Sequence, residues 1–291
     1  MEEAIKKADV LIEALPYIKK FRRKIVVIKY GGSILGEERL RSSILEDVVF
    51  LRYMGLYPIL VHGGGPNITE RMRELRISTE FIEGMRVTDK RTLEIVEEEL
   101  NKLNDVIVKE ISSHNVKGIG IKREDKIIFA QKKKSVRDLG FVGEIVKVDV
   151  KKIKEAVEKG IPVVCPMGIS QEGVAYNINA DEVASFLSYQ VGAEKLVLLT
   201  NVLGVMRNSQ DENSLISTLT VSAGEEFIKE KVIQEGMIPK VKAAIEAIKN
   251  NVRKAHIIDA KIPHALLLEI FTDEGIGTEI VEDKYIHGEK E

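Results

Sequence analysis

The chain has very little cysteine and no tryptophan, and this narrows the classes of protein to which it can belong. Among 291 residues there is one cysteine, Cys165, and aromatic residues make up only 5%. A single thiol excludes an intrachain disulfide framework and is typical of a protein from a reducing cytosol. The five histidines are scattered without the spacing of a zinc site, so no metal centre built from protein ligands is expected.

Long apolar runs and an excess of one charge are also missing. No apolar run reaches the ~20 residues of a membrane-spanning helix, so no membrane contact is expected. Charged residues make up 31% but nearly cancel to a net charge of -2, which provides no electrostatic basis for nucleic-acid binding. The N-terminus is acidic and amphipathic rather than a signal peptide, and this predicts a cytoplasmic location.

Strand-like and helix-like segments alternate along most of the chain. Strands are predicted at 25–30, 58–61, 161–166, 195–199 and 255–258, and helices at 37–54, from Pro66, and at 90–113, 181–191, 222–231 and 239–250. This rhythm predicts an α/β fold whose mainly parallel sheet is covered on both faces and continuous between its two lobes. Short β-rich pieces at 118–121, 126–130 and 140–148 are expected to form antiparallel hairpins at its rim.

Two of the predicted strands end in glycine-rich turns, Lys29-Tyr30-Gly31-Gly32 and His62-Gly63-Gly64-Gly65-Pro66. Glycine lets backbone N–H groups approach an anion closely, and Lys29 can direct an ammonium at the same anion, as a phosphoryl transferase requires. The alternative is an ordinary strand-end lysine and a tight structural turn. A P-loop and a G-x-S-x-G hydrolase elbow are both absent from the sequence.

Polar residues later in the chain are candidates for binding a substrate. Arg86 suits capture of a carboxylate, although a surface salt bridge is an equal alternative. Asn177 and Asn179 alternate on an extended segment and can hydrogen-bond an amide. Asp181 is expected to cap the next helix and to orient lysines, the alternative being a cap with an Asx-rich turn. Lys240, inside a helix N-terminus, makes sense if an anion lies between it and the dipole.

Together these segments resemble the acetylglutamate kinases of the amino-acid kinase family, from about Ala8 to Ile280. The strings that carry the resemblance are KYGG at 29–32, VHGGGP at 61–66, GMRVTD at 84–89, DLGFVGE at 138–144, YNINADEVA at 176–184, GMIPKV at 236–241, AHIID at 255–259 and HALLLEIFTDEGIGT at 264–278. The resemblance implies a three-layer αβα sandwich. It also implies transfer of the γ-phosphoryl group of ATP, carrying Mg²⁺, to the γ-carboxylate of N-acetyl-L-glutamate, in arginine biosynthesis.

The resemblance also implies roles for individual residues. Lys29 and Lys240 would stabilise the transferring phosphoryl group, with Asp181 organising them. The implied substrate-binding residues are Gly64, Gly65, Arg86, Asn177 and Asn179, and the implied nucleotide-binding residues are Gly31, Gly32, Thr200, Asn201, Gly204 and Met237. No general base is required, because a carboxylate is ionised at neutral pH.

The N-terminal stretch resembles the extension of arginine-inhibited, hexameric members of this family. Residues 1–23 would form an oligomerisation helix, 24–172 a lobe for acetylglutamate and dimerisation, and 173–291 a lobe for ATP. Arginine would bind at Tyr17, Lys195, Glu269 and Gly277. A PII-type signalling protein is a candidate partner, on which the sequence does not decide.

Some positions depart from the family pattern: Ser33, the loop 120–126, Asn201, Ala260 and Lys261. Asn201 is expected to weaken positioning of the nucleotide loop, and Ala260 with Lys261 to alter the arginine site. The alternatives to an acetylglutamate kinase are an amino-acid kinase for another acidic amino acid and a catalytically weak arginine-sensing paralogue. The retained lysines and Asp181 favour an active enzyme.

Overall fold

The computed structural model describes residues 1, 5, 12–31, 37–82, 84–208, 210–234, 236–272 and 275–284. Its main sheet has eight strands in the order β12-β14-β13-β11-β1-β2-β8-β5. Their bounds are β12 Thr218–Thr220, β14 Thr278–Val281, β13 Lys254–Asp259, β11 Lys195–Thr200, β1 Ile25–Tyr30, β2 Tyr57–His62, β8 Ile161–Val164 and β5 Gly118–Ile121. All neighbours pair in parallel except β13 and β14, which are antiparallel. One sheet therefore runs through both predicted lobes.

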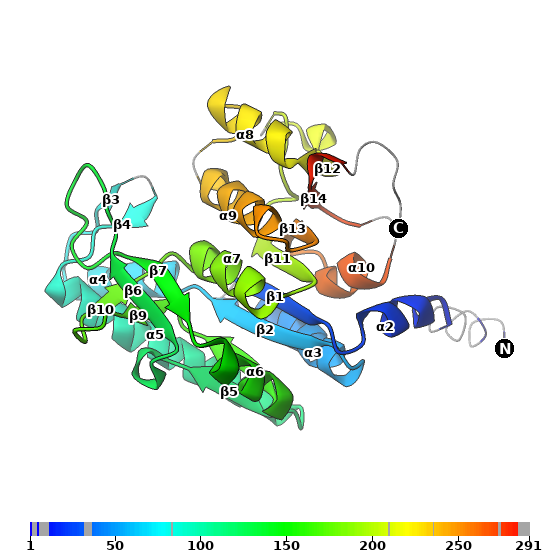
Figure 1. The fold of residues 1–291 in the computed structure, drawn as a ribbon, viewed down its shortest axis with the longest axis horizontal. Coiled ribbons are helices and arrows are strands. Elements are labelled where there is room, and N and C mark those ends of the chain that lie inside the picture. The colour runs from blue at the N-terminus through cyan, green and yellow to red at the C-terminus, as the bar shows by residue number, and fades with distance from the viewer. Residues whose placement is uncertain are drawn as a thin grey trace.

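Helices cover both faces of this sheet, as the alternation predicted (Figure 1). One face carries α6 (Val150–Lys159), α7 (Ala180–Val191), α8 (Val221–Lys229) and α9 (Met237–Lys249), and the other carries α3 (Glu38–Tyr53), α5 (Lys90–Ser113) and α10 (Ala265–Phe271). Successive strand residues point to opposite faces, so Val27 enters one hydrophobic core and Ile28 the other. The αβα sandwich is confirmed.

A smaller four-stranded sheet lies beside the main one, in the order β10-β9-β6-β7. Its strands are β10 Ala175–Asn177, β9 Met167–Ile169, β6 Ile128–Lys132 and β7 Gly143–Val148. Nearby lie α4 (Gly65–Glu74), the hairpin of β3 (Phe81–Ile82) and β4 (Met85–Arg86), and the short helix η2 (Arg123–Asp125). Another short helix, η3 (Glu212–Ser214), lies between β11 and β12 in the chain. Antiparallel pairing of β6 with β7 agrees with the expected hairpin. The prediction for 118–121 was wrong, because this segment pairs in parallel with β8, where both strands gain buried neighbours.

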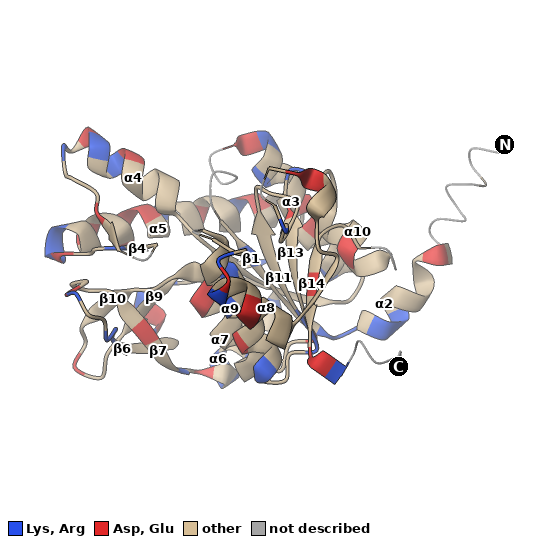
Figure 2. Ribbon diagram, turned by 90° about the horizontal axis from the view of Figure 1, so that it is seen from above, with Lys and Arg blue, Asp and Glu red and all other residues tan. Residues whose placement is uncertain are grey.

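Residues 12–21 lie at the end of the molecule opposite the β3–β4 hairpin (Figures 1 and 2). Helix α2 (Leu15–Phe21) starts after a turn at Ala14, with Pro16 in its first turn, where the missing N–H of proline costs no helical hydrogen bond. Most of the predicted helix before Ile12 falls outside the described residues. Helix α2 packs against α10, and Phe21 is buried in the core between them.

The distribution of charge agrees with the near-neutral balance of the sequence. Basic and acidic residues are interspersed along the described helices (Figure 2). Within the described ranges, no helix is both long and apolar enough to cross a membrane.

Candidate active site

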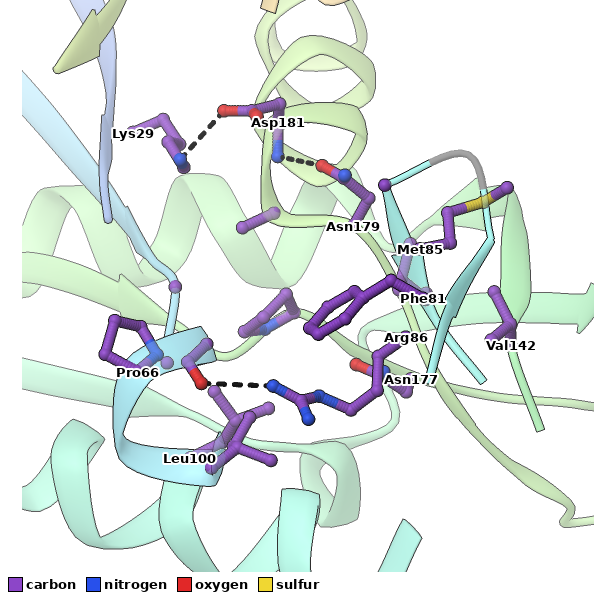
Figure 3. A pocket seen from close by; sticks show the side chains of 18 residues that line it. Lys29, Pro66, Phe81, Met85, Arg86, Leu100, Val142, Asn177, Asn179 and Asp181 are labelled. Atoms are coloured by element: carbon purple, nitrogen blue, oxygen red, sulfur yellow. Dashed lines mark hydrogen bonds and ion pairs between the residues drawn. The ribbon is translucent and has the colours of Figure 1, made fainter. Parts of the chain in front are cut away.

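A cavity of about 210 Å³ lies where the two sheets meet, close to the C-terminal ends of β1 and β2 (Figure 3). Its wall combines the glycine-rich turn, the β3–β4 hairpin and the start of α7. The residues that line it are Lys29, Gly63, Gly64, Gly65, Pro66, Ile68, Phe81, Gly84, Met85, Arg86, Leu100, Val142, Pro166, Asn177, Ile178, Asn179, Ala180 and Asp181. In open α/β sheets, ligands bind beyond the carboxyl ends of the strands, and this cavity occupies that position.

Three charged side chains from distant parts of the sequence meet beside the cavity, and two of them, Lys29 and Asp181, line it. Lys29 is the next-to-last residue of β1, Asp181 lies in the first turn of α7, and Lys240 lies in the first turn of α9. Asp181 Oδ1 lies 2.9 Å from Lys29 Nζ, and its Oδ2 lies 3.2 Å from Lys240 Nζ. The predicted catalytic residues are therefore brought together, with one carboxylate between two ammonium groups.

Burial and charge compete in setting the ionisation of these groups. Burial alone would raise the pKa of Asp181, but the ammonium groups of Lys29 and Lys240 outweigh it and hold that pKa below its usual range. Burial also lowers the pKa of Lys29, and the carboxylate of Asp181 opposes this change. Asp181 thus stays ionised, and it holds Lys29 in the cavity wall with one oxygen and Lys240 with the other.

Asn179, rather than Asp181, caps helix α7. Its Oδ1 accepts hydrogen bonds from the backbone N–H groups of Asp181 at 2.8 Å and Glu182 at 3.4 Å. The prediction that Asp181 is the cap was wrong, because the helix begins one residue earlier, at Ala180. The cap leaves the Asp181 carboxylate to bind the lysines, and it commits the Asn179 oxygen to the backbone.

The glycine-rich turns leave space for charged and backbone groups. A Cβ on Gly31 would lie 2.7 Å from Lys29 Nζ, so a larger residue there would shift the ammonium from its observed place. Gly64 caps α4 without a side-chain hydrogen bond, and a Cβ on Gly65 would meet nothing within 4 Å. Backbone N–H groups at this helix start are the kind that bind anions. Gly32 lies outside the described residues.

Arg86 is buried in the wall of the cavity. Its Nη2 donates to the Gly65 carbonyl at 3.1 Å and to Thr69 Oγ1 at 2.7 Å, and its guanidinium lies 4.7 Å from the ring centre of Phe81 (Figure 3). Within the described residues no carboxylate pairs with it, and burial lowers its pKa. The alternative of a surface salt bridge is therefore wrong, and a buried cation remains for an anionic ligand.

Asn177 lies on β10 at the same wall. Its Nδ2 donates to Thr88 Oγ1 at 3.2 Å, while Thr88 in turn donates to the Arg86 carbonyl at 2.7 Å. Both asparagines line the cavity, as their alternation predicted. The sequence analysis missed three residues around Arg86: Phe81, Thr69 and Thr88. Stacking of a ring on a guanidinium and hydrogen bonds from or to hydroxyl groups depend on tertiary contacts, so they leave no local pattern in the sequence.

The residues predicted for the nucleotide lie at the same edge of the sheet but outside this cavity. Thr200 ends β11, Asn201 follows it on the surface, and Met237 begins α9. Gly204 has a φ of 158°, and a Cβ there would lie 2.6 Å from Thr278 Oγ1. A larger hollow of about 1090 Å³ meets the cavity at Gly84, Met85 and Asn179. The four predicted nucleotide residues named above do not line this hollow either.

The residues predicted for arginine do not all lie at one end of the sheet. Gly277 lies against Ile257 and Ile258, which pair with Leu198 and Leu199 near the carboxyl end of β11, whereas Lys195 lies at the other end. Lys195 begins β11, so it is about 16 Å from Thr200 at the usual strand rise. Lys195 Nζ lies 3.4 Å from the Glu269 carbonyl and 5.1 Å from the ring centre of Phe21. A Cβ on Gly277 would lie 2.3 Å from the Ile257 carbonyl oxygen. Tyr17 packs on the same core from α2.

His256 is a member of this group that the sequence did not reveal. It is buried on β13, and its Nδ1 lies 2.6 Å from Glu269 Oε1. Burial lowers the pKa of His256, against the carboxylate of Glu269. Burial would raise the pKa of Glu269, but hydrogen bonds from His256 and from the Ile276 N–H hold it below its usual range. A histidine within the apolar run 255–258 was the available signal.

The comparisons with known proteins agree with this fold and site. The model of the amino acid kinase family matches residues 24–259. The acetylglutamate kinase of Syntrophomonas wolfei subsp. wolfei is 46% identical over 283 residues, which are 96% of this chain and 99% of that protein. The acetylglutamate kinase of Petrotoga mobilis is 44% identical over 286 residues, which are 97% of this chain and 96% of that protein.

A solved structure shares the fold at low sequence identity. It is N-acetylglutamate synthase from Neisseria gonorrhoeae complexed with coenzyme A and N-acetyl-glutamate, with a TM-score of 0.85 and 22% identity. The match covers 95% of this chain and 63% of that one. With a family model over most of its length and relatives above two fifths identity, this chain belongs to the amino acid kinase family and, within it, to the acetylglutamate kinases.

Proposed function

We propose that this chain transfers the γ-phosphoryl group of ATP to the γ-carboxylate of N-acetyl-L-glutamate, giving N-acetyl-L-glutamyl phosphate and ADP in arginine biosynthesis. The observation that carries the proposal is the pair of cations, Lys29 and Lys240, held by Asp181 beside a cavity. Relatives at about 45% identity name the acceptor class, and Arg86 supports an acceptor with a second carboxylate.

The proposed step forms one bond and breaks another without moving a proton. A γ-carboxylate oxygen attacks the γ-phosphorus, and the bond from that phosphorus to the oxygen of ADP breaks, with the electron pair leaving on ADP. The acceptor is already ionised at neutral pH, so the protein has to position the reactants and neutralise charge. Lys29 and Lys240 stabilise the charge on the transferring group, and Asp181 fixes their positions.

The charges and amides that line the cavity support one orientation of the acceptor. Its α-carboxylate binds the guanidinium of Arg86, and its acetyl amide faces Asn177 and Asn179. The N–H groups of Gly64 and Gly65 then hold the attacking carboxylate. The free Nδ2 of Asn179 suits the acetyl carbonyl, since its oxygen is committed to the helix cap.

ATP extends from the same site over the carboxyl edge of β11 and the start of α9. Gly31 and Gly32 approach its phosphates, and Thr200, Asn201, Gly204 and Met237 contact the nucleotide. Mg²⁺ enters as part of this substrate, bound to the phosphate oxygens. Among the described residues, no group of three or more His, Cys, Asp or Glu is arranged to hold a metal ion.

L-Arginine is the proposed inhibitor, with its site at Tyr17, Lys195, Glu269 and Gly277. The ionised carboxylate of Glu269 supports binding of a guanidinium, and the ring of Phe21 lies beside Lys195 Nζ. The proposed assembly is a hexamer of three dimers joined by residues 1–23. Exposed apolar side chains at Ile12 and Leu15 support a contact there. Residues 24–172 and 173–291 remain the proposed acceptor and nucleotide lobes.

An assay of acyl-phosphate formation tests the reaction. Purified protein is given ATP, Mg²⁺ and N-acetyl-L-glutamate, and the product is trapped with hydroxylamine. Glutamate, aspartate and aminoadipate, each with and without an N-acetyl group, are run in parallel. Turnover restricted to N-acetyl-L-glutamate supports the proposal. A preference for another acceptor contradicts the substrate, and no turnover with any of them favours a non-catalytic arginine sensor.

Added L-arginine and light scattering test the finer parts. Suppression of turnover by arginine supports the regulatory site, and unchanged turnover contradicts it. A mass six times that of the chain, lost on deletion of residues 1–23, supports the hexamer. Binding of a PII-type protein remains a prediction from the resemblance, and a titration with such a protein from the source organism tests it.

A further inference from the structure

His62 lies buried directly beneath the glycine-rich turn, outside the lining of the cavity. Its Nδ1 lies 2.9 Å from the carbonyl oxygen of Gly63. On the other side of the ring, Nε2 lies 3.1 Å from Asn104 Nδ2 and 3.3 Å from Cys165 Sγ. All three side chains are almost completely buried, and none of them is among the residues assigned to the proposed transfer above.

The hydrogen bonds of this group determine which nitrogen of His62 carries the proton. A carbonyl oxygen only accepts, so Nδ1 has to donate to Gly63. Asn104 Nδ2 donates one hydrogen to the Val163 carbonyl at 2.9 Å and directs the other at Nε2. Burial raises the pKa of Cys165 to about 12 and lowers that of His62 to about 4. A protonated thiol and a neutral ring suit this arrangement.

Each carbonyl of the glycine-rich turn is held by a donor inside the protein. The Gly63 carbonyl faces His62, the Gly64 carbonyl accepts from the Ile68 N–H at 3.0 Å, and the Gly65 carbonyl accepts from Arg86 at 3.1 Å. The Gly63 N–H is bound as well, to the Tyr30 carbonyl at 2.7 Å. The N–H groups of Gly64 and Gly65 have no hydrogen-bond partner among the described residues.

The geometry of the peptide unit links the hydrogen bond of the Gly63 carbonyl to the direction of the Gly64 N–H. In a trans peptide the C=O and the following N–H point in opposite directions within one plane, and no peptide bond of the described chain is cis. Holding the Gly63 carbonyl toward His62 therefore directs the Gly64 N–H away from His62, toward the cavity that Gly64 lines. Without that donor the Gly63–Gly64 peptide is free to rotate.

We infer that His62 is a positioning residue for the proposed phosphoryl transfer, whose Nδ1–H holds the Gly63 carbonyl so that the Gly64 N–H donates to the reacting anion. This inference rests on the proposed function for its effect on rate. Asn104 and Cys165 keep Nε2 unprotonated and so keep the proton on Nδ1. The ring itself touches neither substrate, and its contribution passes through the backbone.

Two substitutions at His62 distinguish the role of Nδ1 from the role of Nε2. In His62→Asn the amide nitrogen can take the place of Nδ1 and still donate to Gly63, but nothing replaces Nε2. In His62→Gln the amide oxygen can take the place of Nε2 and accept from Asn104 and Cys165, but no donor reaches Gly63. His114→Gln, at the end of α5, is the matched control far from the turn. Thermal unfolding and kcat are measured for all three.

We expect the more stable of the two His62 variants to be the less active one. His62→Gln should unfold at the higher temperature of the pair yet have a kcat about 100-fold below wild type, the usual effect of removing one donor to a reacting anion. His62→Asn should unfold earlier yet keep kcat within about threefold, because its donor remains. Activity that falls in step with the unfolding temperature would overturn the inference, since a purely structural histidine behaves in that way.

The wild-type protein provides a readout that needs neither a stable variant nor turnover. NMR of labelled histidine distinguishes the Nδ1–H form, the Nε2–H form and the imidazolium. A neutral Nδ1–H ring at assay pH supports the inference, and either other form overturns it. If the wild-type protein lacks kinase activity, the proposed function fails, while the tautomer measurement still decides the state of His62.

Discussion

Asp181 Oδ1 lies 2.9 Å from Lys29 Nζ, and both side chains are less than a tenth exposed. The second oxygen of the same carboxylate holds Lys240, so a strand end and two helix starts meet at one buried negative charge. A buried carboxylate between two ammonium groups compensates one of the two positive charges. The remaining positive charge lies at the edge of the cavity, where a phosphoryl group can neutralise it.

Replacing Asp181 with asparagine should affect both rate and stability. The amide keeps the shape but leaves two buried ammonium groups without their counter-ion, so the free energy of unfolding should fall by about 3 kcal/mol. We expect kcat to fall about 100-fold, because the lysines lose their position. Chemical denaturation and steady-state kinetics measure the two effects. Asp105→Asn, at an exposed position, is the control, and an unchanged kcat in Asp181→Asn would contradict the assigned role.

The stability that Asp181 provides should depend on pH in one direction. Its pKa in the folded protein lies below the usual 3.8, so its contribution is complete above pH 3.8 and is lost as the pH falls through the folded value. The difference in unfolding free energy between wild type and Asp181→Asn should therefore be constant near neutrality and shrink in acid. Denaturant titrations at several pH values test this. A difference that grows as the pH falls would contradict the lowered pKa of Asp181 in the folded protein.

Substituting Lys240 with alanine should lower kcat far more than it raises KM. The ammonium acts on charge that develops during transfer, so we expect a loss of about 100-fold in kcat. Lys240→Arg should recover part of the rate, since it keeps the charge. Lys249→Ala, in the last turn of the same helix, is the control. A Lys240→Ala enzyme with normal kcat would exclude the lysine from the chemical step.

Arg86→Lys should weaken binding of the acceptor and leave ATP unaffected. An ammonium keeps the charge but not the fork that bridges the Gly65 carbonyl and Thr69 while facing a carboxylate. We expect KM for N-acetyl-L-glutamate to rise by about 10- to 100-fold, as for a lost hydrogen bond to a charged group. Initial rates at saturating ATP measure it, with the exposed Arg73→Lys as control. An equal rise in KM for ATP would count against this placement of the substrate.

Glu269→Gln should weaken inhibition by L-arginine. The substitution keeps the size of the side chain but removes the charge that faces a guanidinium and holds His256. We expect the concentration of arginine that halves each enzyme's own rate to rise at least tenfold, the loss of one charged hydrogen bond. Dose–response curves compare it with wild type and with Glu225→Gln on α8. Identical curves would place the arginine site elsewhere.

The sequence was most informative where a structure depends on neighbouring residues. Helix α5 was predicted at its observed bounds, because apolar residues recur at helical spacing between a capping aspartate and the final serine. Strand β1 and the glycines after it were equally clear. The strand at 118–121 was misassigned, since pairing with β8 is a long-range choice that no local pattern encodes.

The candidate site likewise has features that local motifs revealed and features that depend on long-range contacts. Lys29, Asp181 and Lys240 were recognised from their motifs, but the exchange of roles between Asn179 and Asp181 depends on where α7 starts, which motif boundaries do not specify. The His62 group was invisible, because its members lie on β2, α5 and the segment after β8.

By itself, the sequence determined the order of strands and helices, the glycine-rich turns and the family to which the chain belongs. These depend on local backbone preferences, on hydrophobic periodicity and on motifs that are contiguous in the chain. Only the tertiary structure decided which charges meet, that Arg86 is buried without a carboxylate, and that every carbonyl of the second glycine-rich turn is held. Such facts depend on distances between segments far apart in sequence, which the packing of helices on the sheet sets.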